Sequence, residues 1–335
     1  MYNGEIDITV GQGRMWNKMF WCRHTFLLLA SMLFVSVAVT GCASSVTTTF
    51  TSATTSSTTS ASVPATTLME EPYLGQKLPG SEPEIFAPGI VSDASFFEYC
   101  GTFSPDGSEY YFYRFYENAP SRILFTRIDG SKWTFPEPCP FSEGFSAGEP
   151  HLTLDNQRLY FMWKRQVSPG EPGYEEEATY YFVERTINGW SEPRFAGQGM
   201  FLSSSSDGQI YTTDMSSRKK EGRTYLARVL TDNGVFTGYE RLNINPRMGF
   251  QAHPCIAPDG SFIIFDVNGG AYMYISFKKS DGTWGEAIDL TKNGFDPLAG
   301  GAYISPDGKF LFFALYDDIW WVDSSVIEEL RPNSL

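Results

Sequence analysis

The sequence predicts an all-β protein whose folded part is a single β-propeller of five blades, each with four antiparallel strands. A turn motif recurs five times at a spacing of about 50 residues, as expected for successive blades. An apolar, aromatic-rich stretch follows each turn. The composition agrees, because 16% of the 335 residues are aromatic, and 31 Gly and 20 Pro can end many short strands. Six blades remain an alternative.

The turns set the order of the blades. Each one reads Ser-Pro-Asp-Gly or a variant of it: Ser104–Gly107, Thr153–Asn156, Ser205–Gly208, Ala257–Gly260 and Ser305–Gly308. Pro presets φ at the first turn position, Asp accepts hydrogen bonds from nearby backbone, and Gly or Asn tolerates a positive φ. The second turn lacks Pro and Gly and the third lacks Pro, so these two blades depart most from the motif.

Two more strands are expected in each unit. The stretches after the turns are nearly continuous apolar runs, which are typical of strands covered on both faces. They are Tyr110–Tyr113, Leu159–Trp163, Ile210–Tyr211, Phe262–Phe265 and Phe310–Phe313. Third strands follow at Ile123–Ile128, Tyr180–Thr186, Thr224–Leu230, Ala271–Phe277 and Asp318–Asp323. Asp-Gly or Asn-Gly pairs such as Asp129-Gly130 then predict hairpins into a fourth strand.

The fifth unit has no fourth strand of its own. Residues Ser81–Gly89 read much like Ser191–Gly199 of the second unit, so residues 81–91 are expected to supply the missing outer strand. Such closure removes a sheet edge. The blades are then expected near residues 92–140, 141–197, 198–243, 244–290 and 291–325 with 81–91.

These turns and strands resemble the TolB-type, WD-like propeller repeats of bacterial envelope proteins, whose hallmark is Ser-Pro-Asp-Gly before an apolar strand. The resemblance covers roughly residues 83–325. It implies a periplasmic or surface binding scaffold, although a fold alone does not transfer a function.

The N-terminal region reads as a lipoprotein leader. An uncharged apolar run at residues 26–40 follows Lys18 and Arg23, and it is too short for a comfortable transmembrane helix. It ends in Val39-Thr40-Gly41-Cys42, which resembles the lipobox of bacterial lipoproteins. The resemblance implies that residues 1–41 are a signal peptide, that Cys42 is lipidated, and that the lipid holds the protein on the membrane outside the cytoplasm.

The tract that follows Cys42 is a predicted tether. Residues 42–67 are mostly Ser and Thr, a composition that cannot bury enough apolar surface to fold, so a disordered linker is expected before the propeller at 68–335. Three cysteines remain in that domain, Cys100, Cys139 and Cys255. Since three is odd, at least one must stay free, and the sequence does not name a pair.

Charge and motifs exclude several functions. The formal net charge of −14 excludes nucleic acid as an expected partner, because binding it needs clustered Lys and Arg. The densest basic run, Arg218-Lys219-Lys220, is short. Since phosphate loops and dinucleotide fingerprints are absent, no cofactor is expected.

The candidate site lies at the mouth of the channel, where the innermost strands begin. The residues four positions before the start of each turn are Cys100, Glu149, Phe201, His253 and Gly301. The residues two positions before the start of each turn are Thr102, His151, Ser203, Cys255 and Tyr303. The strand period of two places both sets on one face. The predicted ligand-binding residues are Glu149, His151, Phe201, His253 and Tyr303. No metal is predicted, because the potential ligands lack the dense spacing of a metal site.

Three functions remain open. The first is a non-catalytic scaffold that binds an envelope protein, peptide or glycan, with loop aromatics such as Phe145 and Phe250 at the channel mouth. The second is a carbohydrate-active hydrolase or lyase, whose acid pair would be Glu98 and Glu149. The third is a structural envelope component without a small ligand.

Overall fold

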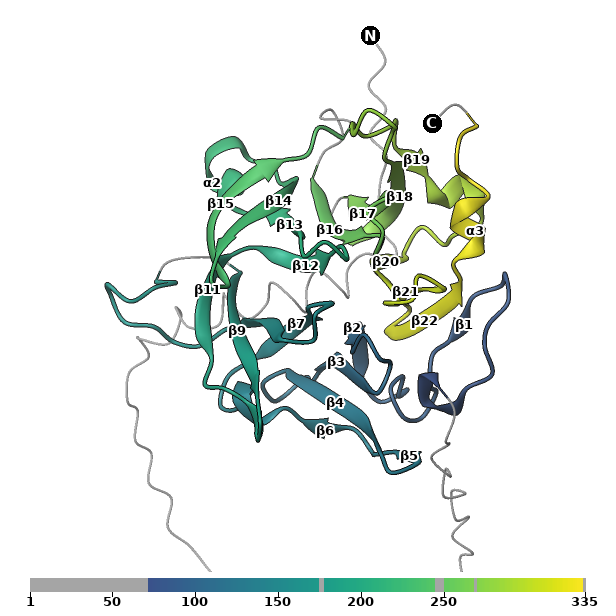
Figure 1. Cartoon of the computed structure of the whole chain (residues 1–335). Helices are drawn as coiled ribbons and strands as arrows, with labels where there is room; N and C mark the ends of the chain where they lie inside the picture. The colour runs from purple at the N-terminus through teal and green to yellow at the C-terminus, as the bar shows by residue number, and fades with distance from the viewer. Residues whose placement is uncertain (1–71, 175–177, 245–249, 268–269, 334–335) are drawn as a thin grey trace, which may run out of the picture. The chain divides into compact units, whose positions relative to one another are not determined.

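The computed structural model describes residues 72–174, 178–244, 250–267 and 270–333. The leader, Cys42 and the Ser/Thr-rich tether lie outside the described residues. Five antiparallel sheets surround a central channel, and their innermost strands β2, β7, β12, β16 and β20 face its axis (Figure 1). The prediction of a five-bladed propeller of four-stranded antiparallel sheets is therefore confirmed.

The strands follow the blade order of the sequence. Blade 1 holds β2 (Phe97–Phe103), β3 (Glu109–Phe115), β4 (Arg122–Asp129), β5 (Lys132–Trp133) and β6 (Glu137–Pro138), and blade 2 holds β7 (Ala147–Leu152), β8 (Arg158–Trp163), β9 (Thr179–Thr186), β10 (Gly189–Trp190) and β11 (Arg194–Gln198). Blade 3 holds β12 (Met200–Ser204), β13 (Ile210–Asp214), β14 (Tyr225–Asp232) and β15 (Val235–Arg241). Blade 4 holds β16 (Gln251–Ile256), β17 (Phe262–Val267), β18 (Ala271–Phe277) and β19 (Ile288–Asp289), and blade 5 holds β20 (Gly300–Ile304), β21 (Phe310–Leu315), β22 (Asp318–Asp323) and β1 (Glu84–Ile85). In blades 1 and 2 the outer strand is split in two.

In four of the five blades the recurrent turn is held by its Asp and its hydroxyl residue, and the fourth turn has Ala257 in place of the hydroxyl residue. In blade 1 the Ser104 hydroxyl donates to Asp106 Oδ1 at 2.6 Å, and the backbone N–H of Ser108 donates to the same oxygen at 3.0 Å. In blade 2 Thr153 and Asp155 make the same contact at 2.6 Å, and Asn156 takes the positive φ of 60°. The turn without Pro and Gly therefore works in the same way.

The last blade takes its outer strand from the N-terminal side of the domain. Glu84 and Ile85 of β1 pair antiparallel with Trp321 and Trp320 of β22. Phe86 follows directly and is fully buried, with its ring centroid 5.1 Å from those of both Trp321 and Phe312. Backbone pairing and aromatic packing together join the two ends of the domain.

Apolar side chains fill the space between neighbouring blades. Five clusters of buried residues lie at the five blade interfaces, and those between blades 4 and 5 and between blades 5 and 1 are the largest. The helical segments are short: 3₁₀ turns at Tyr73–Gly75, Pro140–Ser142 and Leu290–Asn293, α2 (Ser216–Glu221) and α3 (Ser325–Glu328). Among the described residues, no helix is both long and apolar enough to cross a membrane.

Candidate functional site

Every innermost strand has a β-bulge near the mouth of the channel. The register with the second strand shifts at the same point of each blade, for example between Gly148 and His151. In four blades the bulge residue has a left-handed backbone: Glu149 (φ 50°), Phe201 (φ 59°), His253 (φ 51°) and Gly301 (φ 61°). This conformation costs a non-glycine residue about 1–2 kcal/mol, so packing and hydrogen bonds must hold it in place.

Those hydrogen bonds run from blade to blade. The backbone N–H of Phe201 donates to Glu149 Oε2 of the preceding blade at 2.8 Å. The N–H of His253 donates to Thr213 Oγ1 at 3.1 Å, and that of Gly301 donates to Asp266 Oδ2 at 3.0 Å. In each case a bulge N–H finds its acceptor on the neighbouring blade. The bulge therefore explains why polar residues gather at this level.

The residues two before each turn make a second set of contacts between blades. Tyr303 of blade 5 accepts a hydrogen bond from the N–H of Phe103 in blade 1 at 2.9 Å, and Ser203 accepts one from the N–H of Ile256 at 3.1 Å. His151 Nε2 lies 3.0 Å from the Ser204 hydroxyl. Burial lowers the pKa of His151 to about 4, so its imidazole is neutral at physiological pH.

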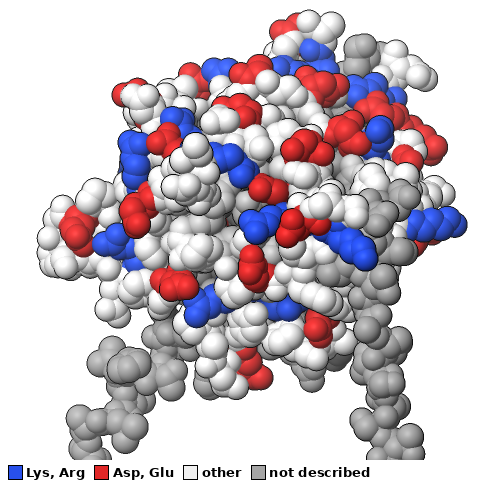
Figure 2. Space-filling view, turned by 60° about the horizontal axis from the view of Figure 1, so that its bottom comes forward, with Lys and Arg blue, Asp and Glu red and all other residues white. Residues whose placement is uncertain are grey.

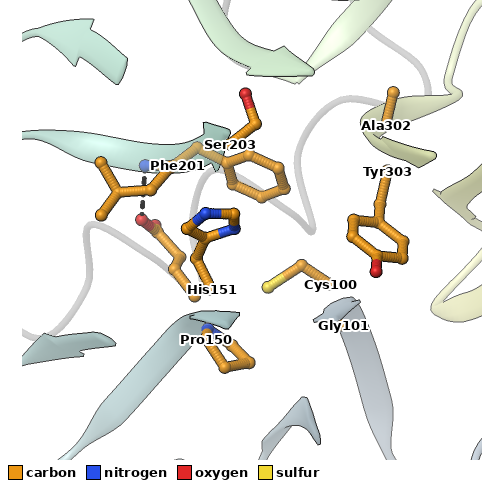
Figure 3. A pocket seen from close by; sticks show the side chains of 10 residues that line it. Cys100, Gly101, Pro150, His151, Phe201, Ser203, Ala302 and Tyr303 are labelled. Atoms are coloured by element: carbon orange, nitrogen blue, oxygen red, sulfur yellow. Dashed lines mark hydrogen bonds between the residues drawn. The ribbon is translucent and has the colours of Figure 1, made fainter. Parts of the chain in front are cut away.

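Four of the five predicted ligand-binding residues line one cavity inside the channel. Figure 3 shows His151, Phe201 and Tyr303 around it with Cys100, and Glu149 lines it as well. The cavity has room for about one water molecule, and a second one of similar size lies next to it along the channel. In the part of the channel that these described residues line, side chains leave room for little more than single water molecules.

The fifth predicted residue, His253, belongs to a different cluster. Its Nδ1 lies 2.7 Å from Asp266 Oδ2 and 3.1 Å from the phenol oxygen of Tyr99. The Tyr99 ring also packs edge-on against Phe201, with centroids 6.0 Å apart. Sequence reasoning missed Tyr99 and Asp266. The bulge puts Tyr99 out of the period-two alternation, and Asp266 belongs to a second strand, which the alignment of first strands did not include.

The two predicted catalytic carboxylates are engaged in separate contacts. Glu98 is fully buried, and its Oε1 accepts from Arg114 Nε at 2.5 Å. Burial raises the pKa of Glu98 to about 7, although the Arg114 guanidinium acts in the opposite direction. Glu149 accepts hydrogen bonds from the Tyr180 hydroxyl and the Phe201 N–H. Neither carboxylate faces a cavity that could hold a sugar ring.

Six of the eleven exposed large apolar side chains of the described residues lie around the mouth. They lie in the loops that enter first strands, in the loops between second and third strands, or at the start of a third strand: Phe145, Tyr174, Phe250, Tyr272, Leu298 and Tyr316. Figure 2 shows acidic and basic side chains mixed over the surface that it presents, without a broad basic field. The described residues hold no group of His, Cys, Asp and Glu side chains arranged for a metal ion.

Fold and site together define a five-bladed β-propeller whose channel is filled by its own side chains. No protein-family model matches the chain, and no curated protein does. It is similar to TolB from Acinetobacter baumannii, with 14% identity and a TM-score of 0.44 over 67% of this chain and 53% of that one. It is similar to a putative TolB from Agrobacterium tumefaciens, with 17% identity and a TM-score of 0.45 over 68% of this chain and 77% of that one.

An enzyme of known structure is similar to this chain to the same degree. The gluconolactonase XC5397 from Xanthomonas campestris has 12% identity and a TM-score of 0.41, over 74% of this chain and 97% of that one. The chain spans about half the length of the Acinetobacter TolB. At these identities and TM-scores the likenesses assign no function to it.

Proposed function

We propose that the protein is a non-catalytic binding scaffold of the bacterial cell envelope. In this proposal the lipid on Cys42 anchors it outside the cytoplasm, and the Ser/Thr-rich tether holds the propeller away from the membrane. The face around the channel mouth, which we call the mouth face, binds a macromolecule, and a protein or peptide is the favoured ligand.

The observation that supports this proposal most is the contrast between the channel and its rim. The cavities that the described residues line inside the channel have about the size of a water molecule, whereas the residues around the mouth expose large apolar side chains. Small molecules bind in concave sites that cover most of their surface. Exposed aromatic side chains on a surface without such a site favour a protein or peptide partner, because tyrosine and phenylalanine are typical of protein interfaces.

The hydrolase alternative receives less support. A retaining or inverting glycosidase needs two carboxyl groups about 5–10 Å apart on either side of a bound sugar. Glu98 has no exposed surface and is paired with Arg114, and Glu149 holds the bulge of the next blade. Both side chains therefore have structural roles that account for their positions.

The test is site-specific photocrosslinking in living cells of the source bacterium, with the full chain. A benzophenone amino acid replaces Phe145 on the mouth face or, as a control, Phe135, which is 65% exposed between β5 and β6 on the outer edge of blade 1. We expect one recurrent crosslinked envelope protein from position 145 and none from position 135. Crosslinks from position 135 alone, or from neither position, contradict the use of the mouth face.

The anchor is tested separately. Cys42→Ser removes the thiol that would receive the lipid, so metabolic labelling with a fatty-acid analogue should mark the unmodified protein and not the variant. An unmodified protein that carries no label would exclude lipid anchoring through Cys42.

A further inference from the structure

Hydrogen bonds to a single loop, residues 296–298, link exposed apolar residues of blades 4 and 5. The N–H of Tyr272 donates to the carbonyl of Pro297 at 2.9 Å, and the N–H of Leu298 donates to Asp296 Oδ1 at 2.8 Å. The Tyr316 hydroxyl donates to Asp296 Oδ2 at 2.6 Å. We call the region of Tyr272, Asp296, Leu298, Tyr316 and Asp317 the Asp296 surface.

The most exposed aromatic side chain of this surface stands on an unusual turn. Tyr316 and Asp317 are the two residues that connect β21 and β22, and their φ angles are 52° and 72°. Two-residue hairpin turns of this kind prefer Asn and Gly, because both positions need a positive φ. Here the turn presents a tyrosine ring that is 61% exposed. Neither the burial of the ring nor the preference of the turn explains tyrosine at this position.

Carboxylates surround the aromatic side chains without compensating cations. Burial and the nearby charges of Asp317 and Asp93 raise the pKa of Asp318. Within the described ranges, no Lys or Arg forms an ion pair with Asp93, Asp296, Asp317 or Asp318, whereas several acidic residues elsewhere are paired, such as Glu109 with Arg185 and Glu184 with Arg158. This part of the mouth face therefore has an uncompensated negative charge.

We propose that the Asp296 surface binds a segment of a partner protein that has Lys or Arg side chains next to apolar ones. This inference rests on the proposed function of the mouth face. The ammonium or guanidinium groups would form charge-assisted hydrogen bonds with the carboxylates and lie over the tyrosine rings, and the apolar side chains would contact Leu298. Complementary charge of this kind sets orientation and speeds association. A neutral glycan would gain little from these carboxylates.

The test compares two triple variants of the full chain in detergent that each remove three negative charges. The first is Asp296→Asn with Asp317→Asn and Asp318→Asn. The matched control is Asp129→Asn with Glu137→Gln and Asp232→Asn, three exposed residues outside the mouth face; Asp129 and Asp232 lie in hairpins at the other end of the blades, and Glu137 lies in the outer strand β6. The probe is a fluorescent synthetic peptide of alternating Lys and Leu, measured by anisotropy near physiological salt. We expect the first variant to bind about tenfold more weakly and the control to stay within about twofold of the unmodified protein.

A single substitution controls for the possibility that the first triple variant misfolds. Tyr316→Asn removes the ring but suits a positive φ, so this variant should keep or raise the melting temperature while it binds the peptide more weakly. Equal losses in both triple variants, or no binding of the peptide to the unmodified protein, would overturn the inference. If the crosslink from position 145 persists in the first triple variant, the proposed function stands and only the basic partner is excluded. If the crosslink is absent from the unmodified protein, the proposed function itself fails.

Discussion

Tyr99 Oη of blade 1 lies 3.1 Å from His253 Nδ1 of blade 4, across the mouth of the channel. The same nitrogen lies 2.7 Å from Asp266 Oδ2, which also accepts the N–H of Gly301 in blade 5. The ring of Tyr99 leaves no space for a side chain at Gly301, since an added Cβ would come within 2.9 Å of it. Three blades that are not all adjacent are therefore tied together at one point.

The first prediction concerns pH. Burial alone would lower the pKa of His253, but the Asp266 carboxylate outweighs it and raises the pKa. A folded-state pKa above the unfolded value stabilises the protein below about pH 6.5, and this stability is lost as the pH rises through the folded-state pKa. Urea unfolding at several pH values should show that decline in the unmodified protein. In His253→Gln the part of the decline above pH ~6.5 should disappear.

Glu98 provides the internal reference for that experiment. Its pKa of about 7 in the folded state exceeds the ordinary value for glutamate, so stability should also fall as the pH rises from about 4.5 to 7. Glu98→Gln removes this second decline and leaves that of His253. A His253→Gln profile that overlays the unmodified one would exclude a charged His253 in the folded state.

The second prediction concerns the buried ion pair of blade 1. Arg114 Nε donates to Glu98 Oε1, and one of its terminal nitrogens donates to the carbonyl of Val91 at 2.9 Å. At pH 8, above the pKa of Glu98, Arg114→Met removes the cation that offsets the burial of this carboxylate, so chemical denaturation should show a loss of about 3–5 kcal/mol. Adding Glu98→Gln should recover part of it. Arg228→Met, which breaks the exposed pair with Glu240, should cost no more than about 1 kcal/mol.

The repeat made the fold predictable, because each turn needs the same local chemistry in every blade. Asp106 and Asp155 hold their turns through the same contact although only one turn has Pro and Gly. The short α2 was missed, because Arg218 and its neighbours read as a charged loop and the helix is only six residues long. The propensity of so short a segment says little about its conformation.

The candidate site was predicted less completely, and the bulges explain the difference. A period of two correctly grouped Glu149, His151, Phe201 and Tyr303 around one cavity. The same period could not show that Tyr99, one residue before the bulge position, also reaches the channel. Hydrogen bonds between blades are equally invisible in a single sequence. Residues that were predicted to bind a ligand therefore form hydrogen bonds with neighbouring blades of the propeller itself.

The third prediction concerns the closure of the ring. Phe86 is fully buried between blades 5 and 1 and packs edge-on against Tyr110, Phe312 and Trp321. Phe86→Ala should destabilise the propeller by about 3–5 kcal/mol, because it leaves a cavity at the seam. The control Phe135→Ala, at an exposed position, should stay within about 0.5 kcal/mol. Similar losses for both variants would mean that the N-terminal segment contributes little to closure.

The last prediction concerns the thiols. The sequence allowed one disulfide among Cys100, Cys139 and Cys255, but all three are free and buried in the structure. Burial raises the pKa of each thiol, that of Cys255 to about 12, so the thiolate that attacks disulfide reagents is scarce. In the processed protein these three thiols should not react with Ellman's reagent until guanidinium unfolds the chain. All three should then react together. Fast labelling of one thiol in the folded protein would mean that its blade opens locally. A disulfide-linked peptide pair in a non-reducing digest would mean that two of these cysteines are oxidised in the cell and that their strands depart from the arrangement described here.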